Sequence, residues 1–118
     1  VHAVCVHLGL QEAHRQHQLR RVCDLVNSFP ANEAVVLAGD FNDWRHRAHD
    51  ILHREAGLQE VFVQAFGRAV RTFPAAMPLL ALDRIYVRNA TVHSPLALPK
   101  KPWDKLSDHA PLAAEILL

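Results

Sequence analysis

The sequence predicts a mixed α/β domain, and two observations support this prediction. In the first half of the chain, apolar β-branched runs alternate with segments of helical periodicity. In the second half, strand-like runs follow one another more directly. Because this alternation is typical of layered α/β folds, we expect one mixed, largely antiparallel sheet with helices on one face.

The first half of the chain predicts two strands and two helices. Residues 1–10, VHAVCVHLGL, are rich in β-branched residues and predict a buried strand. Residues 11–29 carry apolar side chains at steps of three and four, which predicts a helix. The apolar run 33–40 predicts a second strand, buried on both faces. Asp43 is placed to cap a second helix over residues 44–57.

The second half predicts three strands and two irregular segments. Prolines forbid regular structure around residues 74–78. Residues 81–89 predict a strand, and residues 90–98 predict a second strand paired to it. Residues 99–111, with three lysines and three prolines, predict an irregular loop. Residues 112–118 predict a final strand, with a helix as the competing interpretation because Ala, Glu and Leu favour helices.

Composition limits the range of functions. The chain has 118 residues, 50% hydrophobic and 21% charged, which suits one domain. Its formal charge of +1 gives no general attraction to nucleic acid or anionic membranes, so a polyanion would need a local patch. No apolar run reaches the roughly 18 residues of a membrane span, and none resembles a signal peptide.

The two cysteines and the chain start lead to two further expectations. Cys5 and Cys23 lie among apolar residues, so we expect reduced core thiols and a cytoplasmic location, with a targeting signal upstream of Val1 left open. Val1 lies directly inside a strand-like run, and the single methionine is Met77. We therefore expect a fragment of a longer protein. With at least four apolar strands and two clear helices, one sheet face would need another layer.

Ionisable and amide side chains gather at or beside the ends of the predicted strands. The set is His7, Asp40, Asn42, Asp83, Asp108 and His109. Functional groups in layered α/β folds collect at strand ends, where loops leave room for a ligand. Carboxylate oxygens suit a hard cation such as Mg²⁺ or Mn²⁺, and an Asp bonded to a His fixes the tautomer of that His.

Each of these residues also has a purely structural interpretation. Residues 39–43, GDFND, could form an ordinary turn, and Asp83 with Arg84 could form a surface ion pair. His7 could be a core histidine with its hydrogen bonds satisfied, and residues 107–109 could be an ordinary loop. The functional interpretation therefore depends on the six side chains meeting in space.

Four stretches resemble one known family. VHLGL (6–10), LAGDFND (37–43), LDRIYVR (82–88) and LSDHAPL (106–112) resemble the carboxy-terminal half of the endonuclease/exonuclease/phosphatase superfamily, the fold of deoxyribonuclease I. RTFPA (71–75) is similar to a loop that precedes the third stretch in that family. The wording of the stretches is closest to uncharacterised bacterial members. The resemblance implies that residues 1–118 are half of a four-layer α/β sandwich, with the amino-terminal half missing.

The resemblance also implies roles for the site residues. His7 would contact the scissile phosphate, and Asp40 would orient or deprotonate the attacking water. Asn42 would hold the nucleophile or a phosphoryl oxygen. Asp83 would bond to His109, which would stabilise charge on phosphorus or act as base. Asp108, with Asp40 as a further candidate, would bind Mg²⁺ or Mn²⁺, and the substrate would be a phosphate ester of a nucleic acid, a phospholipid or a small molecule.

The resemblance leaves one requirement unmet. Family members take an Asn and a metal-binding Glu from the first half of the domain, and no residue of this chain can be assigned to them. We therefore expect a metal-dependent phosphoesterase or nuclease as the full-length parent and an inactive fragment here. The alternative is a non-catalytic module that forms a homodimer through its exposed sheet face.

Three weaker signals remain. Lys100, Lys101 and Lys105 flank Trp103, and this basic aromatic loop could hold a phosphate-bearing substrate or could be a solvated lysine loop. The three histidines His46, His49 and His53 would share one helical face, where a solvated surface is favoured over a zinc site because the HExxH glutamate is missing. On the first helix, Arg15 and Gln18 are expected to tie the helix to the sheet.

Overall fold

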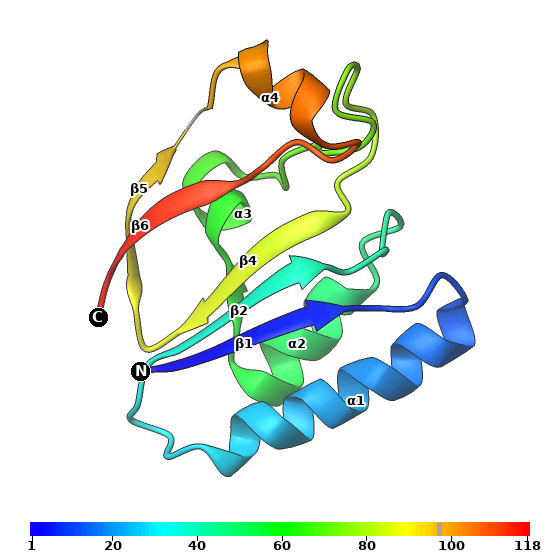
Figure 1. Cartoon of the computed structure of the whole chain (residues 1–118). Helices are drawn as coiled ribbons and strands as arrows, with labels where there is room; N and C mark the ends of the chain where they lie inside the picture. Colours follow the sequence, from blue (N-terminus) through cyan, green and yellow to red (C-terminus); the bar gives the residue numbers. More distant parts are fainter. Residues whose placement is uncertain (97) are drawn as a thin grey trace.

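The computed structural model describes residues 1–96 and 98–118 and confirms the mixed α/β class (Figure 1). The elements in chain order are β1 (His2–His7), α1 (Glu12–Ser28), β2 (Val35–Asp40), α2 (Ala48–Ala56), β3 (Gln59–Glu60), α3 (Val61–Phe66), β4 (Asp83–Arg88), β5 (Thr91–Leu96), α4 (Lys100–Leu106) and β6 (Ala113–Leu117). The last segment is thus a strand and not a helix. None of the described helices is long and apolar enough to span a membrane.

The strands form two sheets instead of the single sheet expected. Four strands pair in the order β1-β2-β4-β3, with β1 parallel to β2 and β4 antiparallel to β2 and β3. β5 and β6 form a separate antiparallel pair. The expected pairing of residues 90–98 with residues 81–89 is therefore wrong, although Ala97 itself lies outside the described residues.

A turn at Asn89 explains why β5 leaves β4. Asn89 has a left-handed backbone with φ 54°, and its side-chain amide donates to the carbonyl oxygens of Ala31 and Glu33 at 2.5 and 3.0 Å. Beyond this turn, Val92 packs with Phe62 of α3 in an apolar cluster to which β6 also contributes. Because α3 packs against both β4 and β5, this cluster joins the two groups of strands.

The main core lies between the four-stranded sheet and helices α1 and α2. Leu19 and Val26 of α1, Leu52 of α2, and Leu37 and Tyr86 of the sheet are buried there. α3 packs instead with Val87, on the other face of β4. The expectation that helices lie on one face therefore holds for α1 and α2 and fails for α3.

Two segments differ from their predicted structure for local reasons. The helix expected over 44–57 begins at Ala48, because the Asp43 carboxylate accepts the backbone N–H groups of Arg47 and Ala48 at 3.0 and 2.6 Å. The loop expected over 99–111 contains α4. Its Lys101 is extended (φ −97°, ψ 139°) as the residue before a proline, and helical turns follow Pro102.

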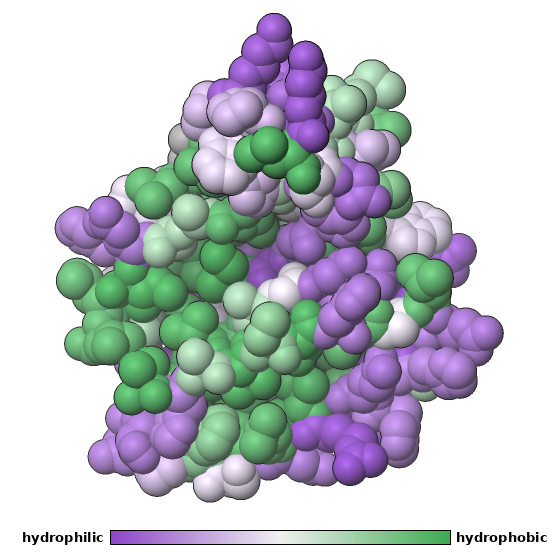
Figure 2. Space-filling model, viewed as in Figure 1, coloured by the Kyte–Doolittle hydropathy of each residue, from purple (hydrophilic) through white to green (hydrophobic). Residues whose placement is uncertain are grey.

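The face of the four-stranded sheet that lies opposite α1 and α2 is covered at β4 by α3 and is open along β1. Cys23 is buried as expected, but Cys5 is exposed, because it lies on the side of β1 that faces away from α1. Ala3 is exposed on the same side, beside the half-buried Val36 and Ala38 of β2. Figure 2 shows apolar side chains spread over this side of the molecule, where β1, β2, β5 and β6 lie in Figure 1.

Candidate active site

Strand register brings three of the expected site residues into a row. The parallel pairing of β1 and β2 sets His7 beside Asp40, and the antiparallel pairing of β2 and β4 sets Asp40 opposite Asp83. Side chains at paired positions share one face of a sheet. His7, Asp40 and Asp83 therefore stand side by side at one end of the open face.

His109 joins the row from the segment that leads into β6. Two backbone hydrogen bonds hold this segment to the loop before β4: Ala75 N–H donates to the Asp108 carbonyl, and Ala110 N–H donates to the Thr72 carbonyl, both at 2.7 Å. His109 lies between these two anchored positions. Its ring is thus positioned by backbone contacts on both sides.

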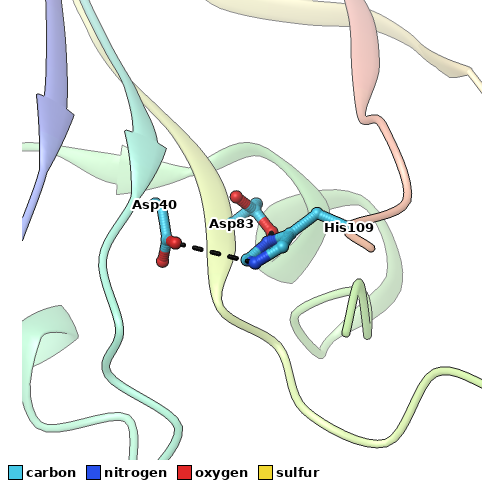
Figure 3. A group of neighbouring side chains, drawn as sticks. All are labelled: Asp40, Asp83 and His109. Carbon is cyan, nitrogen blue, oxygen red and sulfur yellow. Dashed lines mark hydrogen bonds and ion pairs between the residues drawn. The ribbon is translucent and has the colours of Figure 1, made fainter. Parts of the chain in front are cut away.

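Asp83 fixes the orientation of the His109 ring. Asp83 Oδ2 lies 2.6 Å from His109 Nδ1 (Figure 3). The same oxygen accepts the Thr72 hydroxyl at 2.6 Å. The Phe73 ring lies beside the imidazole, with 5.0 Å between centroids. A His109 that donates from Nδ1 to Asp83 turns its Nε2 toward Asp40, whose Oδ2 lies 3.8 Å away.

The acidic surroundings favour the charged form of His109. Partial burial lowers the pKa of the imidazole, but the hydrogen bond and charge of Asp83, together with the charges of Asp40 and Asp108, outweigh burial and raise this pKa above its ordinary value. His7 is the second imidazole at the site. Its Nε2 lies 3.7 Å from Asp40 Oδ2, and its side chain is 80% exposed.

Asn42 holds the turn that follows β2. Its side-chain amide donates to the Leu8 carbonyl at 2.6 Å, which ties the end of β1 to the end of β2. Its backbone N–H donates to Asp40 Oδ1 at 2.9 Å. Asn42 has a left-handed backbone with φ 48°. Asp40 Oδ1 is thereby engaged, and Oδ2 is the oxygen that faces the two histidines.

Arg84 lies on the opposite face of β4 from Asp83, because neighbouring residues of a strand alternate. It does not form a surface ion pair with Asp83. Its guanidinium is buried and pairs with Asp43 at 3.1 Å, and it also donates to the carbonyl oxygens of Asp43 and Ala81. Asp83 therefore belongs to the candidate site, whereas Arg84 belongs to the buried core.

Carboxylate oxygens dominate the part of the site where a cation could bind. Within residues 1–96 and 98–118, one group of three metal-ligating side chains converges, namely Asp40, Asp83 and His109, with ligand atoms within 4.8 Å of one another. Asp83 Oδ2 and His109 Nδ1 bond to each other, which leaves Asp40 Oδ2 as the freest ligand. Asp108 is exposed and lies outside this group. This donor set suits a hard cation that keeps several waters.

The residues of two of the weaker sequence signals lie on or beside helices α4 and α2 and do not belong to the converging group of Asp40, Asp83 and His109. Lys100, Lys101, Trp103 and Lys105 are on α4, and all four are exposed. His49 and His53 stack on α2 with 6.0 Å between ring centroids, while His46 precedes the helix, so the three do not share a helical face.

Sequence reasoning missed two residues of the site. It singled out neither Thr72 nor Phe73, although both lie in the RTFPA stretch, and their proximity to Asp83 and His109 depends on how the loop folds back. Arg15 and Gln18 were expected to tie α1 to the sheet. They do so at the loop after β1, where Gln18 Oε1 accepts the Gly9 N–H at 2.9 Å and Arg15 donates to the Gly9 carbonyl at 3.2 Å.

Solved structures share this fold. The chain superposes on a functionally unknown conserved protein of Enterococcus faecalis V583 with a TM-score of 0.77 and 24% identity, covering 97% of this chain and 48% of that one. For D. rerio TDP2 in complex with a single-strand DNA product, the TM-score is 0.77 at 21% identity, covering 98% and 56%. The human nocturnin catalytic domain gives 0.65 at 18%, covering 95% and 45%. At these identities the likeness shows the fold alone.

Sequence relatives are closer. The chain is 58% identical over 118 residues to the uncharacterized protein YbhP of Escherichia coli K12 and to its namesake in Shigella flexneri, covering 100% of this chain and 47% of each relative. It thus spans about half the length of the curated relatives it matches. Residues 8–109 match the model of the Endonuclease/Exonuclease/phosphatase family. The chain therefore belongs to the endonuclease/exonuclease/phosphatase family, whose members are metal-dependent phosphoesterases and nucleases.

Proposed function

We propose that this site hydrolyses a phosphate ester, either a diester or a monoester, by in-line attack of a water molecule. The observation that supports the proposal most strongly is the row of His7, Asp40 and Asp83 closed by His109. It combines a carboxylate oxygen with two imidazole nitrogens, each within 4 Å of that oxygen. Phosphoester hydrolysis needs a positioned water and positive charge at the phosphoryl oxygens, and these groups supply both.

Each residue has a defined part in the proposed reaction. Asp40 accepts a proton from the attacking water as the water oxygen bonds to phosphorus. Protonated His109, held by Asp83, donates from Nε2 to a phosphoryl oxygen and stabilises the charge that builds there. His7 donates a proton to the ester oxygen as its bond to phosphorus breaks. The products are an alcohol and a phosphate or phosphate monoester.

Mg²⁺ is the proposed cofactor, with Mn²⁺ as an alternative. Asp40 and the exposed Asp108 would hold the ion, since Mg²⁺ is commonly bound through one or two carboxylates and several waters. When bound, the ion supplies positive charge to the phosphoryl oxygens. Asp108 is proposed as a ligand because it carries a carboxylate next to His109 in the sequence.

Hydrolysis of bis(p-nitrophenyl) phosphate with Mg²⁺ or Mn²⁺ tests the proposal. We expect Asp40→Asn and His109→Gln, made in a protein of the relatives' length, to lower kcat by about 10²- to 10⁴-fold, as for loss of a general base and of a hydrogen-bond donor to the developing charge. Asp24→Asn, an exposed aspartate of α1, is the matched control and should leave the rate unchanged. Activity that survives both site substitutions would disprove the assignment.

The 118-residue chain on its own is proposed to turn over slowly. Its site stands at the end of a largely open sheet face, and His7 is mostly solvated, so water competes for every charge. A protein of the relatives' length should be faster by several orders of magnitude in the same assay. Equal rates would refute this part of the proposal.

A second candidate function is a non-catalytic module that pairs with a second copy through the open face. The exposed Ala3 and Cys5 on that face support it.

The substrate of the proposed phosphoesterase is a nucleic acid, a phospholipid or a small ester. Nucleic acid is among these candidates because the structure of D. rerio TDP2 holds a single-strand DNA product. Loss of hydrolysis on Asp40→Asn would favour the enzyme over the module.

A further inference from the structure

A second pocket, of about 270 Å³, is lined by Arg84 and Tyr86 on the face of β4 opposite to Asp83. Strand register builds this wall: Glu60 of β3 is paired with Tyr86, and Arg84 lies two residues before Tyr86 on the same face. None of the residues that line this pocket belongs to the candidate active site. The pocket is therefore a separate feature of the molecule.

Four buried polar atoms of the lining residues have no hydrogen-bond partner within the described part of the chain. They are His49 Nδ1, Glu60 Oε1, Arg84 Nε and the Tyr86 hydroxyl. Glu60, Arg84 and Tyr86 are 1%, 2% and 0% exposed. Most buried polar atoms of folded proteins are hydrogen-bonded, so four such atoms around one pocket indicate that an occupant is missing from it.

The remaining atoms of these side chains are already bound, which fixes the unpartnered atoms in place. Glu60 Oε2 accepts the Val63 N–H at 2.6 Å. The Arg84 guanidinium pairs with Asp43 at 3.1 Å and donates to the Ala81 carbonyl at 3.0 Å. A polar site whose side chains are held in this way loses little conformational freedom when a ligand binds.

The unpartnered atoms include both donors and acceptors. Arg84 Nε can only donate. The Tyr86 hydroxyl keeps its proton, because burial raises the pKa of Tyr86 to about 12. Glu60 Oε1 accepts when its carboxylate is ionised, and His49 Nδ1 accepts or donates according to its tautomer. The His49 and Tyr86 rings lie 6.1 Å apart between centroids.

The charges around the pocket disfavour a charged ligand of either sign. An anion would meet the Glu60 carboxylate, and a cation would meet Arg84 and the exposed Arg68, which also lines the pocket. A neutral amide meets neither penalty, because its carbonyl oxygen accepts and its N–H groups donate. The half-buried Val63 and Ala69 supply apolar wall for the rest of such a molecule.

We propose that this pocket binds a small neutral molecule with a primary amide or urea group. The carbonyl oxygen accepts from Arg84 Nε and the Tyr86 hydroxyl, and the amide nitrogen donates to Glu60 Oε1. The volume suits a ligand smaller than a typical drug molecule. The inference is independent of the proposed function, since it uses no residue of the candidate active site.

Three probes of nearly the same size and shape test the proposal: benzamide, benzoate and benzamidine, which are neutral, negative and positive. Each is titrated into the 118-residue chain at pH 8 by calorimetry, with equilibrium dialysis as an independent measure. Because burial raises the pKa of Glu60, pH 8 is chosen to favour its ionised form. We expect benzamide to bind at least about tenfold more tightly than either ion.

Two substitutions test the assigned hydrogen bonds. Tyr86→Phe keeps the ring and removes one donor, so it should lower the affinity for benzamide about three- to tenfold. Glu60→Gln removes the negative charge and should reduce the preference for benzamide over benzoate. If both variants keep the affinities of the unaltered chain, these contacts are wrong and the proposal fails.

A matched pair of substitutions tests the place of binding. Ala69→Phe puts a ring into the pocket and should abolish binding of benzamide. Ala65→Phe, at an exposed position of α3 that does not line the pocket, should leave it unchanged. Binding that survives Ala69→Phe would place the amide elsewhere. Tighter binding of an ion, equal affinity for all three probes, or binding of none, in which case water alone fills the pocket, would overturn the proposal.

Discussion

At the residue scale, one carboxylate oxygen of Asp83 accepts hydrogen bonds from both Thr72 and His109. This arrangement places a fixed negative charge against Nδ1 of the imidazole. The consequence is measurable, because the pKa of His109 is raised: its charged form persists to higher pH than that of a free histidine. The stabilisation that the charged form contributes is complete at low pH and is lost as pH rises through the folded-state pKa.

Asp83→Asn should lower the pKa of His109. The substitution removes both the negative charge and the acceptor that favour the protonated ring, while the burial that lowers the pKa stays. The His109 titration midpoint, followed by NMR in EDTA, should move to lower pH. Thr72→Val removes a neutral partner of Asp83 and is the control: in this variant the pKa of His109 should stay above its ordinary value. An unaltered midpoint in Asp83→Asn would show that Asp83 does not set the charge of His109.

The buried pair of Asp43 and Arg84 gives a second prediction at this scale. The side chains of Arg84 and Asp43 are 1% and 2% exposed, and Asp43 also accepts two backbone N–H groups at the start of α2. Asp43→Ala would leave the guanidinium buried without its counter-ion and should lower the free energy of unfolding by about 3–5 kcal/mol. Urea denaturation measures this. Asp24→Ala should cost little, and a similar loss in both variants would contradict the prediction.

At the element scale, the junction of β1 and β2 depends on Gly39. A Cβ at this position would lie 1.9 Å from the Val6 carbonyl oxygen, and Gly39 has φ 145°, which L side chains rarely adopt. Gly39→Ala should therefore force β1 away from β2 and lower the free energy of unfolding by more than about 2 kcal/mol. Since the same pairing sets His7 beside Asp40, hydrolysis should fall as well. Gly67→Ala, where a Cβ meets nothing within 4 Å but φ is also positive, controls for backbone strain alone.

Local pattern accounts for the elements that sequence predicts well. The apolar runs that became β1, β2, β4 and β6 were recognisable because their residue types and periodicity are local properties. The gathering of His7, Asp40, Asp83 and His109 was predictable because polar residues followed apolar runs in a recurring order. What failed depends on contacts between distant segments: Asn89 turns β5 away from β4 by bonding to Ala31 and Glu33.

The same distinction applies to the candidate site. Its charged members could be predicted from sequence. Thr72 could not, because its contact with Asp83 depends on how the loop before β4 folds back. The exposure of Cys5 could not be predicted either, because β1 has the same apolar pattern whether one face of the sheet or both faces are covered. Residue types thus predicted the charged members of the candidate site, whereas tertiary contacts determine which other side chains hold them in place.

At the scale of the whole molecule, the open sheet face is the main unexplained surface. β1 is an edge strand, and its exposed side carries Ala3 and Cys5 beside the apolar Val36 and Ala38 of β2. Figure 2 shows apolar side chains over this side of the molecule. A continuous apolar surface of this kind is a common site of protein association. The candidate site residues stand at the end of the same face, so whatever covers the apolar part also comes close to them.

Cys5 provides a direct measure of whether a second copy covers this face. If two copies of the 118-residue chain pair through it, modification of Cys5 by a thiol reagent should slow as protein concentration rises, in parallel with dimer formation in sedimentation. Cys23 is the internal reference: it is 3% exposed, and burial raises the pKa of its thiol to about 11, so it should stay unreactive in the folded chain.

A matched pair of substitutions completes this test. Ala3→Lys places a charge on the open face and should restore fast modification of Cys5 at every concentration. Ala13→Lys, at an exposed position of α1 on the other side of the sheet, should leave the protection as it is. If Cys5 reacts equally fast at all concentrations in the unaltered chain, self-association does not cover the face. The apolar surface would then be available to a different segment or protein, and the homodimer proposal would be withdrawn.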